Sequence, residues 1–172
     1  TSDRSMYAYH PQTLEFKKRG TLNCGSGMAT PFSMAVRRNG LAYIIYNDGT
    51  LWQASVKDAS CSAVPFEPLQ QGFFTFGMGF VVNDDNMTEQ LYVADIDYGK
   101  MLSKGMATID LDTFELKLVA PFSGNPGFRI ELTADGQQLY AFIIDEMVGG
   151  GHLAKVDKLT GVLSDIEQVP IG

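Results

Sequence analysis

The sequence contains no long hydrophobic run: nowhere do roughly eighteen consecutive apolar residues occur, the length that a membrane-spanning helix needs. A basic segment followed by an apolar one, the pattern of a secretory leader, is also missing from its start. Basic residues are few, 13 against 20 acidic ones, which gives a net charge of -7. Because nucleic acids are bound mainly through Lys and Arg, we expect no nucleic-acid partner, and we expect no membrane span.

Cysteine is scarce, since Cys24 and Cys61 are the only two in 172 residues. Neither belongs to a CxxC pair or has a nearby histidine, which argues against metal or redox chemistry at these positions. One disulfide of an exported protein and two buried free thiols both fit such a pair. The composition favours the disulfide, and with it an extracellular, cell-surface or periplasmic location. The spacings GxSxG, HExxH and GxGxxG and the P-loop are absent as well, so we predict no catalytic residue.

Sustained helical periodicity is missing too, whereas a repeated strand-turn-strand unit is present. The segments YHPQTLEF, IDLDTFEL and VDKLTGVL each place a threonine-containing turn between two strand-like runs, and SVKDASCSAV is a weaker copy. The reference positions of these four turns are Thr13, Ala59, Thr113 and Thr160. Their spacings of 46, 54 and 47 residues are typical of propeller blades built from four short strands. We therefore predict a single all-β domain over residues 1–172, a β-propeller.

The predicted propeller contains about three and a half four-stranded blades. Its parts are a half blade at residues 1–24 and blades at about 25–68, 69–121 and 122–172. A closed ring takes about four to eight blades, so the chain falls short of one. Three explanations stay open: an excerpt of a longer propeller, two copies that complete a ring, or an open arrangement with protected edges. We favour homo-oligomerisation through exposed blade edges.

The first strand of each blade, in PFSMAVRRNG, TFGMGFVVND and GFRIELTADG, alternates between two kinds of position. The positions expected to face the propeller axis carry Ser33, Ala35, Gly77, Gly79, Arg129 and Glu131. The positions between them carry Met34, Val36, Met78, Phe80, Ile130 and Leu132. Because side chains alternate along a strand and space near the axis is limited, we predict that small residues line a narrow channel and large ones fill the space between blades. The alternative is that the glycines mark a β-bulge.

Arg129 and Glu131 place charge where the other two copies are small and neutral. Two residues apart on one strand, they share a face, so they either bind a polar ligand or form an ion pair that fills the channel. The ion pair is favoured, and both residues are kept as candidate ligand-binding residues. The second strands end in Asn47, Asp97 and Asp145, which are candidate oxygen ligands for one divalent cation. We expect no other cofactor. The alternative is that Asn and Asp stand there because they favour turns.

Aromatic residues precede the first strands, and Phe73, Phe74 and Phe128 are the candidates for ligand contact among them. Beside Gly and Pro on a loop face, aromatic rings form platforms for carbohydrate or peptide ligands. The alternative, favoured for any single ring, is that it seals the gap between blades. A protein or carbohydrate partner is therefore expected at the loop-rich face around the channel.

The motifs LYVADID and LAKVDKLTG resemble strand motifs of secreted bacterial β-propellers of the NHL, YVTN and gluconolactonase-like groups. The set PFSMAV, FGMGF and ELTADGQQLYAF is similar to uncharacterised exported propellers of myxobacterial type. The resemblance spans most of the chain and implies an extracytoplasmic, disulfide-tolerant propeller. Gluconolactonase-like enzymes use a Glu, an Asn and an Asp around an axial metal, but their motif contexts have no residue-by-residue match in this sequence.

We therefore predict a non-enzymatic binding or assembly module of an exported or surface protein. The alternative is a metal-dependent hydrolase of the gluconolactonase-like type. Its candidate residues are Glu131, Asp97, Asp145 and Asn47. A hydrolase of this type needs a bound divalent ion, whereas a binding module does not.

Overall fold

The computed structural model of the chain describes residues 4–25, 27–96, 99, 101–124, 126–127, 129–145 and 150–169. These residues form fourteen β-strands and one short 3-10 helix, Gln70–Gly72. Antiparallel pairing of consecutive strands joins them into one two-stranded and three four-stranded sheets. In this part of the chain, no helix has the length and apolar character needed to cross a membrane. The predicted all-β class is confirmed, and so are the four-stranded antiparallel units.

The sheets are meanders of consecutive strands, as short hairpin turns permit. The N-terminal hairpin contains β1 (Ser5–His10) and β2 (Glu15–Thr21). The first sheet contains β3 (Pro31–Val36), β4 (Leu41–Tyr46), β5 (Leu51–Ser55) and β6 (Cys61–Ala63). The second sheet contains β7 (Thr75–Val82), β8 (Glu89–Ile96), β9 (Met106–Ile109) and β10 (Leu116–Ala120). The third sheet contains β11 (Ile130–Asp135), β12 (Gln138–Asp145), β13 (Gly150–Val156) and β14 (Leu163–Val169).

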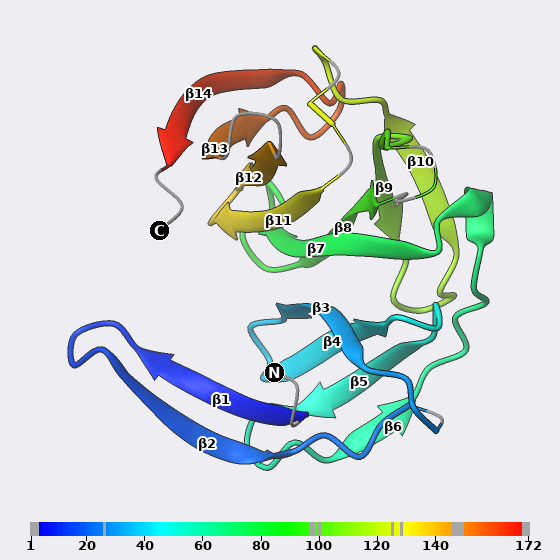
Figure 1. Cartoon of the computed structure of the whole chain (residues 1–172), viewed down its shortest axis with the longest axis vertical. Coiled ribbons are helices and arrows are strands. Elements are labelled where there is room, and N and C mark those ends of the chain that lie inside the picture. Colours follow the sequence, from blue (N-terminus) through cyan, green and yellow to red (C-terminus); the bar gives the residue numbers. More distant parts are fainter. Residues whose placement is uncertain are drawn as a thin grey trace.

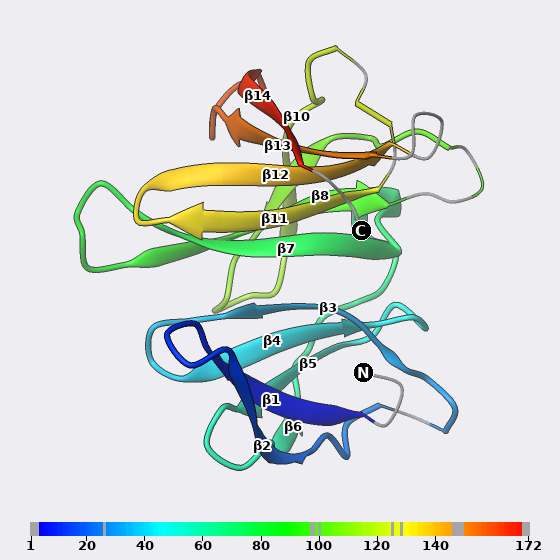
Figure 2. The same ribbon diagram turned by 60° about the vertical axis from the view of Figure 1, so that its left-hand side comes forward.

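The hairpin and the three sheets follow one another in space in chain order (Figure 1), and β3, β7 and β11 lie one above another in Figure 2. The first strand of the second sheet, β7, contacts both β3 and β11, so the three first strands lie together in the middle of the molecule (Figure 1). One apolar core, around Tyr43, Phe76 and Met78, lies between the first and second sheets. Another, around Val81 and Ile130, lies between the second and third sheets. The second sheet is therefore covered on both faces.

The predicted repeat is visible in the backbone, because equivalent turns place one residue in the left-handed region. In each four-stranded sheet, the turn between the third and fourth strands holds one residue in the left-handed region. These residues are Ala59 (φ 61°), Phe114 (φ 59°) and Gly161 (φ 69°). The turn between β1 and β2 holds Leu14 at φ 58°, directly after Thr13. Ala59 is therefore equivalent to Leu14 in the repeat, and Asp58 is equivalent to Thr13. The predicted reference position of this turn, Ala59, is wrong by one residue.

Gly77 and Gly79 lie on the face of β7 that meets the third sheet. Pairing of β7 with β8 runs from Thr75 to Val82 without a register shift, which excludes a bulge. A Cβ atom on Gly77 would lie 2.2 Å from the carbonyl oxygen of Ile130. The glycines thus allow β7 and β11 to meet at backbone contact. The prediction that these two glycines line a narrow channel is wrong, because β11 fills the space that they face.

The face of β3 that points away from β7 is packed differently from the matching faces of β7 and β11. Met34 and Val36 are 45% and 47% exposed, whereas Met78 and Ile130, at the same repeat position as Met34, are 2% and 0% exposed. Among the described residues, no strand covers Met34 and Val36. The prediction that they fill the space between two blades is therefore wrong, because the neighbour that would complete that interface is not among the described strands.

The N-terminal hairpin is anchored on the outer part of the first sheet. Gly20 of β2 lies against the carbonyl group of Asp58, so close that a Cβ atom would clash with its oxygen. Cys24 and Cys61 form a disulfide with a Cα–Cα distance of 5.5 Å, which ties the chain after β2 to β6. The disulfide favoured by composition is confirmed, and it is compatible with an oxidising compartment.

Candidate functional site

A partly buried carboxyl group connects the three first strands. Glu131 on β11 reaches across β7, and its Oε2 accepts a hydrogen bond from Ser33 Oγ on β3 at 2.8 Å. The backbone amide of Met78 on β7 donates a further hydrogen bond to this carboxyl group. Gly77 leaves room for the crossing, because a Cβ atom there would lie 3.0 Å from Glu131 Oε2. One side chain therefore links all three four-stranded sheets.

Burial raises the pKa of Glu131 above its ordinary value, because desolvation penalises the carboxylate. The hydrogen bonds from Ser33 and Met78 lower this pKa, but the effect of desolvation is larger. A higher pKa in the folded than in the unfolded state means that the folded protein binds the proton more tightly. The resulting stabilisation is fully present below the unfolded pKa and is lost as the pH rises through the folded pKa.

Glu131→Gln is expected to remove this part of the pH dependence of the free energy of unfolding. The amide has nearly the same shape and keeps one oxygen that can accept a hydrogen bond, but it does not ionise. Urea unfolding of both proteins at about pH 4 and about pH 8 measures the effect. The stability of the wild type relative to the variant should be greater at the acidic pH.

The control is Glu67→Gln, which changes an exposed carboxyl group. This variant should keep the pH profile of the wild type. Parallel profiles for the wild type and Glu131→Gln would contradict the assignment of a desolvated carboxyl group to the junction of the three first strands.

Arg129, the other half of the predicted charged pair, stands immediately before β11 and is partly buried. Its carbonyl oxygen accepts a hydrogen bond from the Ile144 amide at 3.0 Å, which extends the pairing of β11 with β12. The Glu131 carboxyl group is hydrogen-bonded to Ser33 and Met78, on two other sheets. Ligand binding by Arg129 and Glu131 stays a prediction.

The candidate metal ligands are described only in part. Asn47 closes a loop through two hydrogen bonds to Thr30. Its side-chain Oδ1 accepts a hydrogen bond from the backbone amide of Thr30 at 2.9 Å, and its backbone amide donates one to the Thr30 carbonyl oxygen at 3.0 Å. Asp97 lies outside the described residues, and Asp145 is described only as the backbone partner of Gly150 at the end of β12. Within the described part of the chain, no three His, Cys, Asp or Glu side chains form a metal-binding group. The cation site, and the hydrolase alternative that depends on it, stay predictions.

The candidate aromatic residues have different environments. Phe73 is fully buried in the core between the first and second sheets. Phe74 is 42% exposed, and its ring lies against Gly49 in the loop after β4. Phe128 lies outside the described residues. Of the three candidate aromatic residues, Phe74 is therefore the one whose ring the structure describes at the surface. A platform for a carbohydrate or peptide ligand stays a prediction.

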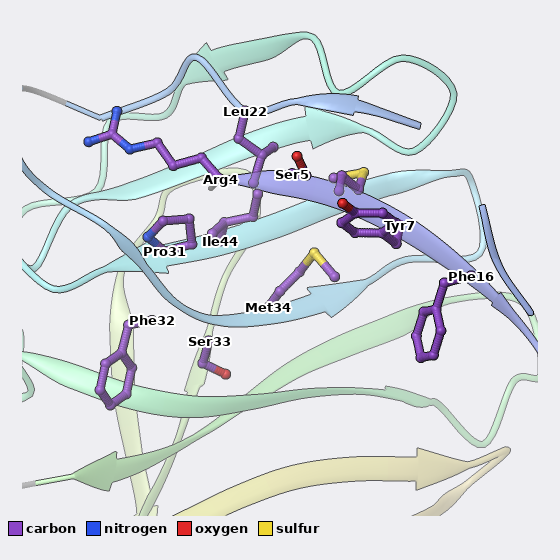
Figure 3. Close-up of a pocket in the computed structure, with 11 residues that line it drawn as sticks. Arg4, Ser5, Tyr7, Phe16, Leu22, Pro31, Phe32, Ser33, Met34 and Ile44 are labelled. Carbon is purple, nitrogen blue, oxygen red and sulfur yellow. The ribbon is translucent and has the colours of Figure 1, made fainter. Parts of the chain in front are cut away.

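A groove lies between β1 and β3, beside the first strands (Figure 3). It has two parts, of about 300 Å³ and about 290 Å³, which share Met6, Tyr7 and Met34 and are therefore continuous. Figure 3 shows Met34 pointing towards β1 and Ser33 pointing to the opposite side of β3. Side chains that line the groove and are themselves exposed include Tyr7, Tyr9, Phe16, Met34 and Val36.

The groove combines an apolar wall with a strand edge. Among the described strands, β1 pairs with β2 alone, so its other edge has no strand partner. Such a combination fits an added β-strand, which gains hydrogen bonds from the edge and burial from the wall. Sequence reasoning missed this surface. The apolar alternation at Tyr7 and Tyr9 is the signal that points to it.

No family model matches the chain, and no curated protein matches it. Among solved structures, the computationally designed Ika8 protein aligns at a TM-score of 0.46 with 13% sequence identity. The alignment covers 96% of this chain and 44% of the designed chain, so this chain spans less than half of that protein.

Proposed function

We propose that the chain is a non-enzymatic assembly module of an exported protein, and that a second copy of the chain binds at the open face of its first sheet. The observation that carries this proposal is the exposure of Met34 and Val36, since Met78 and Ile130 are covered at the matching position. A contiguous apolar surface beside a free strand edge is typical of an interaction site. The Cys24–Cys61 disulfide supports export.

The propeller arrangement is part of this proposal. Three four-stranded meanders in chain order, with neighbouring first strands, support it. The resemblance to NHL, YVTN and gluconolactonase-like blades belongs to the same proposal. In a radial arrangement of this kind, each sheet is covered by its neighbours, and an end sheet offers one face for assembly.

The double variant Met34→Asp and Val36→Asp is expected to abolish self-association of the chain. Carboxylates at these positions would have to lose their hydration when the face is covered, which opposes assembly. Sedimentation velocity over a range of protein concentrations measures the mass. The wild type should rise above the single-chain mass of 18.8 kDa with concentration, and the variant should stay at it.

The matched control is Leu159→Asp, which places a carboxylate on a residue that is 81% exposed in the turn between β13 and β14. It should associate like the wild type. Circular dichroism of all three proteins checks that the strands are retained. A wild type that stays at one chain mass at every concentration, or a double variant that associates equally well, would contradict assembly through this face.

A further inference from the structure

The N-terminal hairpin corresponds to the outer half of a four-stranded sheet. Its turn carries Leu14 in the left-handed region, as Ala59, Phe114 and Gly161 do between the third and fourth strands of the three sheets. The sequence YHPQTLEF repeats in IDLDTFEL and VDKLTGVL at the same turns. β1 and β2 therefore match third and fourth strands, and the positions of a first and a second strand beside β1 are open among the described residues.

The later sheets indicate what such a first strand must carry. Ala35 of β3 shares a core with Met78 of β7. On the next interface, a Cβ atom on Gly79 would lie 3.1 Å from the Leu132 carbonyl carbon of β11, so only the smallest side chain fits without movement. Bulky residues of one first strand are thus covered by small residues of the preceding one. Met34 belongs to the bulky set.

We propose that the groove between β1 and β3 binds a β-hairpin whose first strand carries Gly, Ala or Ser at alternate positions. The small residues cover Met34 and Val36, and the second strand pairs with the free edge of β1. This inference rests on the proposed assembly function and specifies the structure that the open face accepts. The groove runs along β1 and β3 and is lined mainly by apolar side chains, as the binding site of an added strand would be.

Strand addition changes a measurable property of β1. In an antiparallel strand paired on one edge, alternate backbone amides point away from the partner and exchange with solvent. A second strand on the free edge protects those amides. Their exchange rates therefore report occupation of the edge by a strand.

The test supplies the hairpin covalently. A second copy of residues 75–105, which contains β7, β8 and the connection to β9, is fused ahead of Ser5 of the full chain. We expect the alternate amides of β1 to exchange at least about tenfold more slowly than in the unfused chain. We also expect self-association to disappear, because the added hairpin covers the same face.

The matched control is the same fusion with Gly77→Leu and Gly79→Leu in the added copy only. Leucine at these positions prevents close approach to β3, so β1 should exchange as in the unfused chain. Unchanged exchange in the glycine fusion, or equal protection in the leucine control, overturns the hairpin assignment.

The inference and the proposed function fail in different ways. If Met34→Asp with Val36→Asp abolishes self-association while the glycine fusion leaves β1 unprotected, the hairpin assignment is wrong and assembly through this face stands. If the fusion protects β1 although the wild type never associates, the groove accepts a hairpin and self-assembly is wrong.

Discussion

Gly77→Ala is expected to lower the free energy of unfolding by about 3 kcal/mol, which corresponds to a fall of about 6 to 12 °C in the melting temperature. The new Cβ atom would lie 2.2 Å from the Ile130 carbonyl oxygen and 2.7 Å from the Glu131 Cα. Both are backbone atoms of β11, so no side-chain rotation relieves the clash. The second and third sheets must move apart, which weakens the core between them.

Alanine variants at three glycines with different amounts of space test whether this loss of stability comes from the close contact between β7 and β11. At Gly79, a Cβ atom would lie 3.1 to 3.2 Å from atoms of Leu132 and Thr133, so Gly79→Ala should destabilise by less than Gly77→Ala. The control is Gly150→Ala in β13, where the nearest atom, Gln168 Nε2, is 3.4 Å away. Alanine there should be neutral or stabilise by about 0.5 kcal/mol, because it loses less backbone entropy on folding.

Urea unfolding followed by tryptophan fluorescence and circular dichroism measures the series. The expected order of stability is Gly150→Ala, then Gly79→Ala, then Gly77→Ala. If the three variants were equally stable, the close contact between β7 and β11 would not exist in solution. The Glu131 pH profile should also change in Gly77→Ala, because the added methyl group lies 3.0 Å from Glu131 Oε2.

Removal of the Cys24–Cys61 disulfide is expected to lower the free energy of unfolding by about 4 kcal/mol. The crosslink joins residues 37 positions apart, and a loop of that length restricts the unfolded chain substantially. The bond also holds the segment after β2 onto β6 of the first sheet. Its loss should therefore release the N-terminal hairpin before the three sheets unfold.

The double variant Cys24→Ala and Cys61→Ala tests this by urea unfolding in the presence and absence of a reductant. Reductant should destabilise the wild type to the level of the variant and leave the variant unchanged. Hydrogen exchange of β1 and β2 should accelerate more than that of β7 and β8. A reductant effect on the double variant, or an unchanged midpoint in the reduced wild type, would contradict a structural role for this bond.

The turns show what the sequence predicts well. Thr13, Thr113 and Thr160 each precede a left-handed residue in the structure, because the geometry of a tight turn depends on a few consecutive residues. In the weaker copy the reference position is Asp58 and not the predicted Ala59, since this segment has no threonine to mark the turn. Strand class and grouping follow from the same local rules of alternation and turn chemistry.

The central carboxyl group shows where prediction from the sequence ends. Ser33 and Glu131 were both expected to face the axis, yet nothing in the sequence pairs two residues 98 positions apart. Their hydrogen bond depends on how far β7 separates β3 from β11, and that distance depends on Gly77. Met34 illustrates the same limit, since it shares the pattern of Met78 but is exposed.

The sequence by itself determined the all-β class, the repeated turns and the alternation of small and large residues along the first strands. These depend on backbone preferences and side-chain direction within a few residues. Only the tertiary structure decided that Gly77 meets the backbone of β11, that Glu131 crosses to Ser33, and that Met34 and Val36 lie open. Each of these depends on which sheet lies beside which, and close packing between distant segments, not local propensity, determines that.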